Sequence, residues 1–306
     1  MSKLKQPSLC AHRLRRRLIS IAAILPAMAS AALVSAPQRG TAPMCRPAAA
    51  VTKLSGLPEA SGVAASRRQP GRLWAHNDSG QELVALTDRG AISGRVQLTG
   101  AKIDDWEALA VGPCPAGSCL YIADIGDNDA ARKRITIHRV PEPDAGAASA
   151  VVGESFHATY PDRAQDTETL LVTPQGELFV VTKGETGPTA LYRFPREMKP
   201  GGVVTLELVG KPRSADKASQ NDRITDGAVS PNGEWVVLRT RSTLLVYAAR
   251  DFLAGSWKEA GRVDLGGLAE PQGEGVAFVD HSTLVVAGEG GGKSQPGSFA
   301  RLSCTF

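Results

Sequence analysis

The sequence predicts an all-β fold that is built from five repeated units, and three observations support this prediction. First, an acidic residue followed by a short apolar stretch recurs at intervals of roughly 50 residues. Second, three further short strands, separated by turn residues, follow most of these acids. Third, the chain shows no sustained helical periodicity of its apolar residues. Four antiparallel strands per unit, repeated around a ring, make a five-bladed β-propeller. The five acids are Glu59, Glu107, Glu168, Asp226 and Glu274.

The four strands of each expected blade can be placed along the chain. The first strand begins directly after each acid. We expect the second strands at 73–75, 120–122, 178–180, 235–237 and 284–286. We expect the third strands at 83–86, 135–140, 190–194, 244–247 and 299–302. We expect fourth strands in the first four blades at 94–99, 154–160, 203–209 and 260–265.

The fifth blade reaches only three strands before the sequence stops at Phe306. Segment 48–54 belongs to no other blade, so we expect it to supply the fourth strand of the last blade. Such a closure joins both ends of the domain in one sheet and removes an open edge from the ring.

The first 31 residues have the pattern of a secretory signal peptide. They contain six basic residues and no acid, followed by an apolar run at 18–25 and small residues up to Ala31. Cleavage after Ala36 is an alternative. A membrane anchor is disfavoured because the apolar run is short and Pro26 interrupts it. We therefore expect export to the periplasm or the extracellular space, by either the Sec or the twin-arginine route. The resulting division is a signal peptide at 1–31, a short N-terminal segment at 32–45 and one propeller domain at 46–306.

The basic excess of the chain belongs to this leader. The full sequence has 35 Lys and Arg against 31 Asp and Glu, a formal net charge of +4. Without the leader the chain is slightly acidic, whereas binding to nucleic acid depends on basic side chains that neutralise phosphates. We expect a monomer with no nucleic-acid partner and no membrane span in the mature chain.

The cysteines predict two disulfide bonds. Four cysteines remain once Cys10 is removed with the leader, and an even number in an exported protein favours disulfides over free thiols. Cys114 and Cys119 flank a short loop, while Cys45 and Cys304 fall where the closing strand meets the last blade. Of the three possible pairings we therefore prefer Cys114–Cys119 with Cys45–Cys304.

One face of the predicted ring collects acidic side chains. In a blade, the first strand begins on the face where the second strand ends, so the five repeat acids and the polar ends of the second strands meet around the channel. Gathered carboxylates repel each other unless they are protonated, paired or bound to a cation. Oxygen ligands suit Ca²⁺, which we expect as the cofactor. Alternatively, each acid accepts hydrogen bonds from the backbone of a neighbouring blade. The metal ligands that we expect are Glu59, Glu107, Asp124, Glu168, Asp226 and Glu274.

The same face offers groups for proton transfer and for charge neutralisation. His76 is a candidate general base near neutral pH, and Asp78 would orient it or bind the metal. Alternatively, this segment forms a turn beside which His76 packs. Lys183 and Arg239 would offset the charge of an anionic substrate. Two functions follow: a metal-dependent hydrolase of a small phosphoester or lactone, or a non-catalytic propeller that binds a ligand or a protein.

Four strings of residues are similar to those of a poorly characterised group of exported bacterial β-propeller proteins, over most of residues 55–290. The chain resembles more distantly, in architecture, the calcium-dependent propeller lactonases and the propeller phytases, and this resemblance implies a metal-dependent hydrolase. The lactonase metal set of one acid, two Asn and one Asp finds no residue-by-residue match here. The four strings are His76-Asn77-Asp78-Ser79-Gly80, Asp105-Trp106-Glu107, Asp124-Ile125-Gly126-Asp127-Asn128 and Arg139-Val140-Pro141-Glu142-Pro143.

Overall fold

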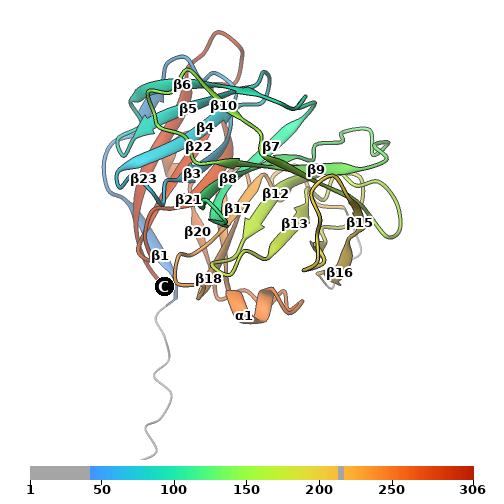
Figure 1. The fold of residues 1–306 in the computed structure, drawn as a ribbon. Coiled ribbons are helices and arrows are strands. Elements are labelled where there is room, and N and C mark those ends of the chain that lie inside the picture. The colour runs from blue at the N-terminus through green and yellow to red at the C-terminus, as the bar shows by residue number, and fades with distance from the viewer. Residues whose placement is uncertain (1–41, 213–216) are drawn as a thin grey trace, which may run out of the picture. The chain divides into compact units, whose positions relative to one another are not determined.

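A computed structural model describes residues 42–212 and 217–306 of the chain. These residues fold into five β-sheets arranged as a five-bladed propeller, which confirms the predicted fold class (Figure 1). The expected signal peptide lies outside the described residues. Within the described part of the chain, no helix has the length and apolar character that a membrane crossing requires.

Each blade is an antiparallel sheet whose strands follow one another along the chain. Blade 1 contains β3 (Ala60–Ala65), β4 (Arg72–Asn77), β5 (Glu82–Thr87) and β6 (Ile92–Thr99). Blade 2 contains β7 (Trp106–Cys114), β8 (Gly117–Asp124), β9 (Ile135–Pro141) and β11 (Glu154–Thr159). Blade 3 contains β12 (Thr167–Val172), β13 (Leu178–Thr182), β14 (Leu191–Arg193) and β16 (Glu207–Gly210). Blade 4 contains β17 (Asp226–Val229), β18 (Trp235–Arg239), β19 (Thr243–Ala248) and β20 (Gly261–Asp264).

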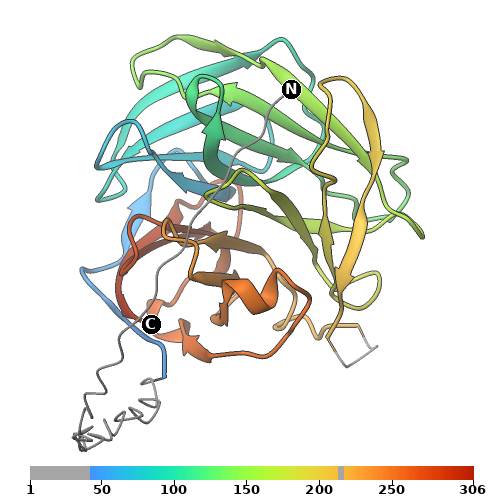
Figure 2. The same cartoon turned by 60° about the horizontal axis from the view of Figure 1, so that its bottom comes forward.

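Blade 5 is completed by strands from the N-terminal side, as predicted. Its strands β21 (Gln272–Phe278), β22 (Thr283–Glu289) and β23 (Gly297–Thr305) are followed in the sheet by β1 (Met44–Pro47) and β2 (Thr52–Leu54), which both pair with β23. Figure 2 shows these blue strands beside the red C-terminal strand. The closing strand is therefore divided into two pieces and starts earlier than the predicted segment 48–54.

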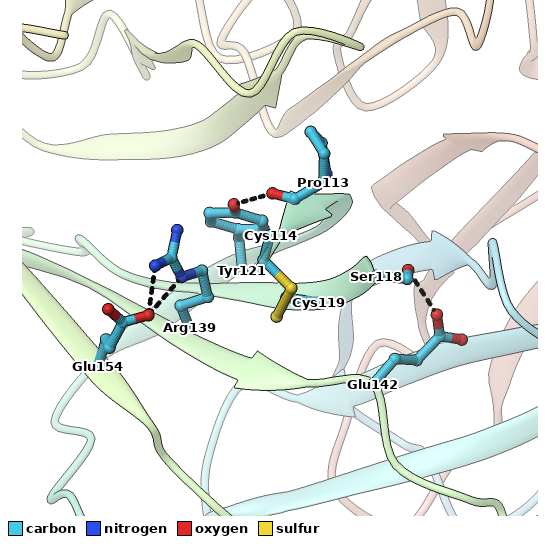
Figure 3. The surroundings of a disulfide bond; sticks show 8 residues. All are labelled: Pro113, Cys114, Ser118, Cys119, Tyr121, Arg139, Glu142 and Glu154. Atoms are coloured by element: carbon cyan, nitrogen blue, oxygen red, sulfur yellow. Dashed lines mark hydrogen bonds and ion pairs between the residues drawn. A yellow bond between two sulfur atoms is a disulfide. The ribbon is translucent and has the colours of Figure 1, made fainter. Parts of the chain in front are cut away.

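Both predicted disulfides are present. Cys45 lies directly opposite Cys304 in the pairing of β1 with β23, and the two are bonded, so the disulfide fixes the ring closure. Cys114 and Cys119 are bonded across the turn between β7 and β8 (Figure 3). The hydroxyl of Tyr121 donates a hydrogen bond to the carbonyl oxygen of Pro113 at 2.6 Å and holds the same turn.

The hydrophobic core lies between neighbouring blades. The first strands β3, β7, β12, β17 and β21 contact one another in this order and close the ring through β21 and β3. Apolar side chains on facing sheets then pack together; Tyr121 of blade 2, for example, belongs to one cluster with Leu170 and Tyr192 of blade 3. The alternation of apolar residues along each strand thus buries both faces of the blades.

The sequence missed two short strands. β10 (Ser149–Val151) pairs in parallel with β6, and β15 (Val203–Thr205) pairs in parallel with β11, so each extends the outer edge of the preceding blade. The predicted strand 203–209 is consequently divided between two blades, with buried Leu206 at the break. Strands of three residues are too short to produce a recognisable alternation, which explains the error.

Two short helical turns were also missed. They are α1 (Ala249–Phe252) and the 3-10 turn Gly266–Leu268, and both lie in connections between strands of the last two blades. Neither is long enough to show helical periodicity in the sequence.

Candidate functional site

A cavity of about 250 Å³ opens where the first strands of the blades begin. We call it the channel mouth. Its wall contains six carboxylates, namely Asp78, Asp105, Glu107, Glu168, Glu274 and Glu289. It also contains three cationic side chains, namely Lys183, Arg223 and Arg241. Of the site residues predicted from the sequence, the structure brings together Asp78, Glu107, Glu168, Lys183 and Glu274.

Three of the carboxylates form a compact group, which we call the acidic triad. Oxygen atoms of Asp78, Asp105 and Glu107 lie within 4.8 Å of one another. Asp78 follows β4 in blade 1, whereas Asp105 and Glu107 stand at the start of β7 in blade 2. The triad therefore lies at the junction of these two blades, and its members come from the two segments that the strand order brings to one face.

A glycine makes room for the triad. A Cβ atom on Gly126, which follows β8, would come within 2.5 Å of Asp105 Oδ2 and of Glu107 Oε1. Any side chain at this position would thus displace two of the three carboxylates. The requirement for glycine here is steric.

Burial and mutual repulsion raise the pKa of every carboxyl group in the triad. Burial is the largest cause for Asp78, Asp105 and Glu107 alike, and neighbouring carboxylates add to it: Glu59 acts on Asp78, Asp78 acts on Asp105, and Glu168 acts on Glu107. A raised pKa means that the negative charges of the site are incompletely compensated by the protein. Protons or a bound cation would supply the missing positive charge.

Glu168 and Lys183 form an ion pair beside the triad. Lys183 Nζ lies 2.5 Å from Glu168 Oε1 and 3.5 Å from Asp166 Oδ2. Burial opposes the charge of Lys183, but the surrounding carboxylates outweigh this effect and raise its pKa. Burial also raises the pKa of Glu168 to about 7, although Lys183 acts in the opposite direction. In Glu274, burial and then the charge of Glu168 raise the pKa to about 8.

His76 has a structural environment. Its side chain is fully buried, and its ring lies 4.1 Å from that of Trp106. His76 Nε2 accepts a hydrogen bond from the Gly62 backbone N–H at 3.1 Å, so Nδ1 carries the proton and donates to the Asn77 carbonyl oxygen at 2.9 Å. Burial lowers the pKa of His76 to about 4. The structure therefore places His76 behind the wall of the channel mouth, with both ring nitrogens already engaged.

Arg239 likewise lies outside the channel mouth. It is fully buried between blades 4 and 5, where Nη1 donates to the carbonyl oxygens of Gly275 and Ala287 at 2.6 and 2.7 Å. Its Nη2 forms an ion pair with Glu270, which also accepts a hydrogen bond from Ser298. These contacts join the last two blades.

Two of the predicted metal ligands accept backbone hydrogen bonds instead. Asp226 Oδ2 accepts from the Val276 N–H at 2.8 Å in the next blade, and the carboxyl group is 1% exposed. Asp124 Oδ1 accepts from the Asp105 N–H at 3.0 Å and from Arg132 at 2.8 Å. The contact of Asp226 is of the kind given above as the alternative to metal binding, whereas Asp124 accepts from its own blade.

Glu59 stands at the rim. Its Oε2 accepts a hydrogen bond from the Ser79 hydroxyl at 3.2 Å, and its Oε1 lies 3.6 Å from Lys293 Nζ. It is not among the residues that line the channel mouth.

Four charged residues of the channel mouth were not among the predicted site residues: Asp105, Arg223, Arg241 and Glu289. Three of them stand within two residues of a selected position or at the end of a second strand, so the strand order placed them near the correct face. What the sequence lacked was the direction of each side chain, because the chain leaves regular strand geometry at these points.

No protein-family model matches the chain, and no curated protein matches its sequence. Similar solved structures include three β-propeller proteins. The PQQ-bound aldose sugar dehydrogenase of Streptomyces coelicolor has 12% identity and a TM-score of 0.47, covering 86% of this chain and 98% of that one. A luciferin-regenerating enzyme has 9% identity and a TM-score of 0.49, covering 83% and 94%. A streptogramin B lyase has 10% identity and a TM-score of 0.43, covering 86% and 98%.

Proposed function

We propose that the protein is an exported hydrolase of a phosphoester or a lactone that depends on a divalent cation, Ca²⁺, held at the acidic triad. The observation that carries this proposal is the convergence of carboxylate oxygens from Asp78, Asp105 and Glu107 within 4.8 Å in an open cavity. The two disulfides agree with an oxidising compartment.

The residues present fit a hard cation. All three triad side chains offer carboxylate oxygens, and the amide of Asn128 lies in the same wall. Ca²⁺ takes six to eight oxygen ligands in flexible geometry, so these groups together with water satisfy it. The raised pKa values of the triad also favour a bound cation, because its positive charge would offset the repulsion among these buried carboxylates.

The side chains around the triad have distinct roles in this proposal. Asp78, Asp105 and Glu107 would hold the cation, which would polarise the scissile group and lower the pKa of a water molecule. Glu168, which lies in the wall beside the triad, would accept the proton of that water and return it to the leaving group, a role given above to His76. Lys183 holds the Glu168 carboxyl group in place through the 2.5 Å contact with Oε1.

A non-catalytic ligand-binding or protein-binding propeller is the second candidate function. One observation favours it. The carboxylates of Asp124 and Asp226 accept hydrogen bonds from backbone N–H groups, so these two acidic residues stabilise the structure. This candidate predicts a channel mouth that binds a ligand without turnover.

A pair of assays separates the two candidates. The purified protein would be tested for hydrolysis of p-nitrophenyl phosphate and of δ-valerolactone, in millimolar Ca²⁺ and in EDTA. The proposal predicts turnover of one of them in Ca²⁺, none in EDTA, and loss of turnover in Asp105→Asn. The control variant is Glu197→Gln, which changes an exposed carboxyl group outside the channel mouth. Calcium-independent turnover, or turnover retained in Asp105→Asn, would contradict the proposal, and binding without turnover would favour the scaffold.

A further inference from the structure

Two arginines of the channel mouth have no role in the site described so far. Arg223 precedes β17 and Arg241 follows β18, so both belong to blade 4. The first strands of the blades contact one another in ring order, and in a ring of five the blade opposite the junction of blades 1 and 2 is blade 4. The two guanidinium groups therefore stand across the channel mouth from the acidic triad. We call them the arginine pair.

The arginine pair keeps donors available, whereas Lys183 does not. Arg241 Nη2 donates to the neutral Gln272 Oε1 at 2.6 Å, and Arg241 forms no ion pair among the described residues, although its charge acts on the pKa of Glu289. Arg223 Nη1 forms an ion pair with Glu185 at 2.8 Å, but its Nε is buried without a hydrogen-bond partner among the described residues.

Lys183, by contrast, is enclosed by acidic side chains. Glu168, Asp166 and Glu185 lie 2.5, 3.5 and 3.7 Å from its Nζ. Arg241 is therefore the cationic side chain of the channel mouth that forms no ion pair among the described residues, while Arg223 shares Glu185 with Lys183.

We propose that the arginine pair binds the phosphoryl group of a phosphate monoester, jointly with the cation at the acidic triad. Guanidinium groups present planar pairs of N–H donors that match the oxygen atoms of a phosphate. A neutral lactone would leave the charge of the arginines unused, so this inference selects the phosphoester among the two substrate classes. It rests on the proposed function, because the cation must bind first.

The charges of the channel mouth explain why the two ligands depend on each other. Six carboxylates face three cationic side chains, so a dianion meets an excess of negative charge when no cation is bound. A divalent cation at the triad reverses this balance on one side of the cavity. Cation and phosphate monoester therefore bind cooperatively, and by thermodynamic reciprocity each raises the affinity for the other by the same factor.

Isothermal titration calorimetry with two ligands tests the inference. Ca²⁺ is first titrated into the EDTA-treated and dialysed full chain, and phenyl phosphate is then titrated with and without Ca²⁺. We expect phenyl phosphate to bind at least about tenfold more tightly with Ca²⁺ than without it. Arg241→Gln should weaken this binding by about tenfold or more and leave Ca²⁺ binding in place, because one charged hydrogen bond is lost. Arg223→Gln should act in the same direction.

The control removes the same charge elsewhere. Arg250→Gln lies on α1, outside the channel mouth, and should leave both isotherms unchanged (Figure 1). A flat Ca²⁺ isotherm would contradict the proposed function itself. A normal Ca²⁺ isotherm contradicts only the present inference if phenyl phosphate then fails to bind, binds equally well in EDTA, or binds equally well to Arg241→Gln. Retained Ca²⁺ binding in the variants shows that they are folded.

Discussion

The two ends of the central channel are formed by the same five first strands, yet their walls have opposite chemistry. The end where the strands begin carries six carboxylates around a cavity of about 250 Å³. The other end is lined mainly by apolar side chains such as Val63, Leu109 and Leu170, around a cavity of only about 40 Å³. Each first strand thus runs from an acid to a packed apolar residue. The comparison indicates that one end carries the binding chemistry and the other end stabilises the ring.

The largest effect is expected where a buried charge joins the blades behind the channel mouth. Arg239→Met leaves the carboxylate of Glu270 buried without its partner, since both side chains are almost fully buried. We expect the free energy of unfolding to fall by about 4 kcal/mol. Urea denaturation measures this change. The double variant Arg239→Met/Glu270→Gln should recover part of the loss, and a double variant that is no more stable than the single one would contradict the explanation.

A large-to-small change at the apolar end should lower stability without affecting cation binding. Leu170→Ala removes a side chain that is 1% exposed and packs between blades 2 and 3. We expect a loss of about 3 kcal/mol in the free energy of unfolding, from lost burial and the cavity that remains. The rise in melting temperature caused by Ca²⁺ should stay the same as in the unchanged protein. A lost Ca²⁺ response would mean that the two ends are not separate.

His76 should make the folded protein less stable as the pH falls. Burial lowers its pKa in the folded state to about 4, below the ordinary value of 6.5, so the unfolded chain binds the proton more tightly. The stabilising contribution is complete above the unfolded pKa and is lost as pH falls towards the folded pKa, by about 3 kcal/mol. Urea denaturation in EDTA between these pH values measures the slope. His76→Gln should flatten this slope, whereas His281→Gln, at an exposed histidine, should not.

Glu274 should contribute a slope of the opposite sign. Burial raises its folded pKa to about 8, so the folded state binds the proton more tightly than the unfolded chain does. Its stabilising contribution is complete below the ordinary pKa of Glu and is lost as pH rises through the folded pKa. In EDTA and above this pH, Glu274→Gln should raise the free energy of unfolding, because the neutral amide carries no buried charge. The comparison is with Glu197→Gln, and equal stability of the two variants would contradict the prediction.

The repeat of acid and apolar strand was sufficient to predict the fold. It located the first strands, and the positions of Cys45 and Cys304 then indicated how the ring closes, because a disulfide needs the two Cα atoms within about 7 Å of each other. The sequence did not predict the three-residue strands β10 and β15 as outer strands of the preceding blades, because their pairing depends on a neighbouring blade rather than on a local pattern.

The sequence predicted on which face of the ring the candidate site lies, but not which side chains line it. Strand order brought Asp78, Glu107 and Lys183 to the channel mouth, as the structure shows. It could not show that Arg239 turns into the core while Arg241, two residues later, lines the cavity, since β18 ends at Arg239. Nor could it show that both nitrogens of His76 are occupied by backbone groups. These properties depend on side-chain direction beyond the ends of strands.

The most direct test of the account is a calorimetric titration of Ca²⁺ into the metal-free protein and into Glu107→Gln. Glu107 belongs to the acidic triad, and its pKa is raised well above the usual value, first by burial and then by Glu168. Glutamine keeps the shape of the side chain but replaces one carboxylate oxygen by an amide nitrogen and removes the negative charge that attracts a cation. The account predicts saturable binding of Ca²⁺ to the unchanged protein and at least about a tenfold loss of affinity in the variant. No binding to the unchanged protein, or equal binding to both, would contradict it.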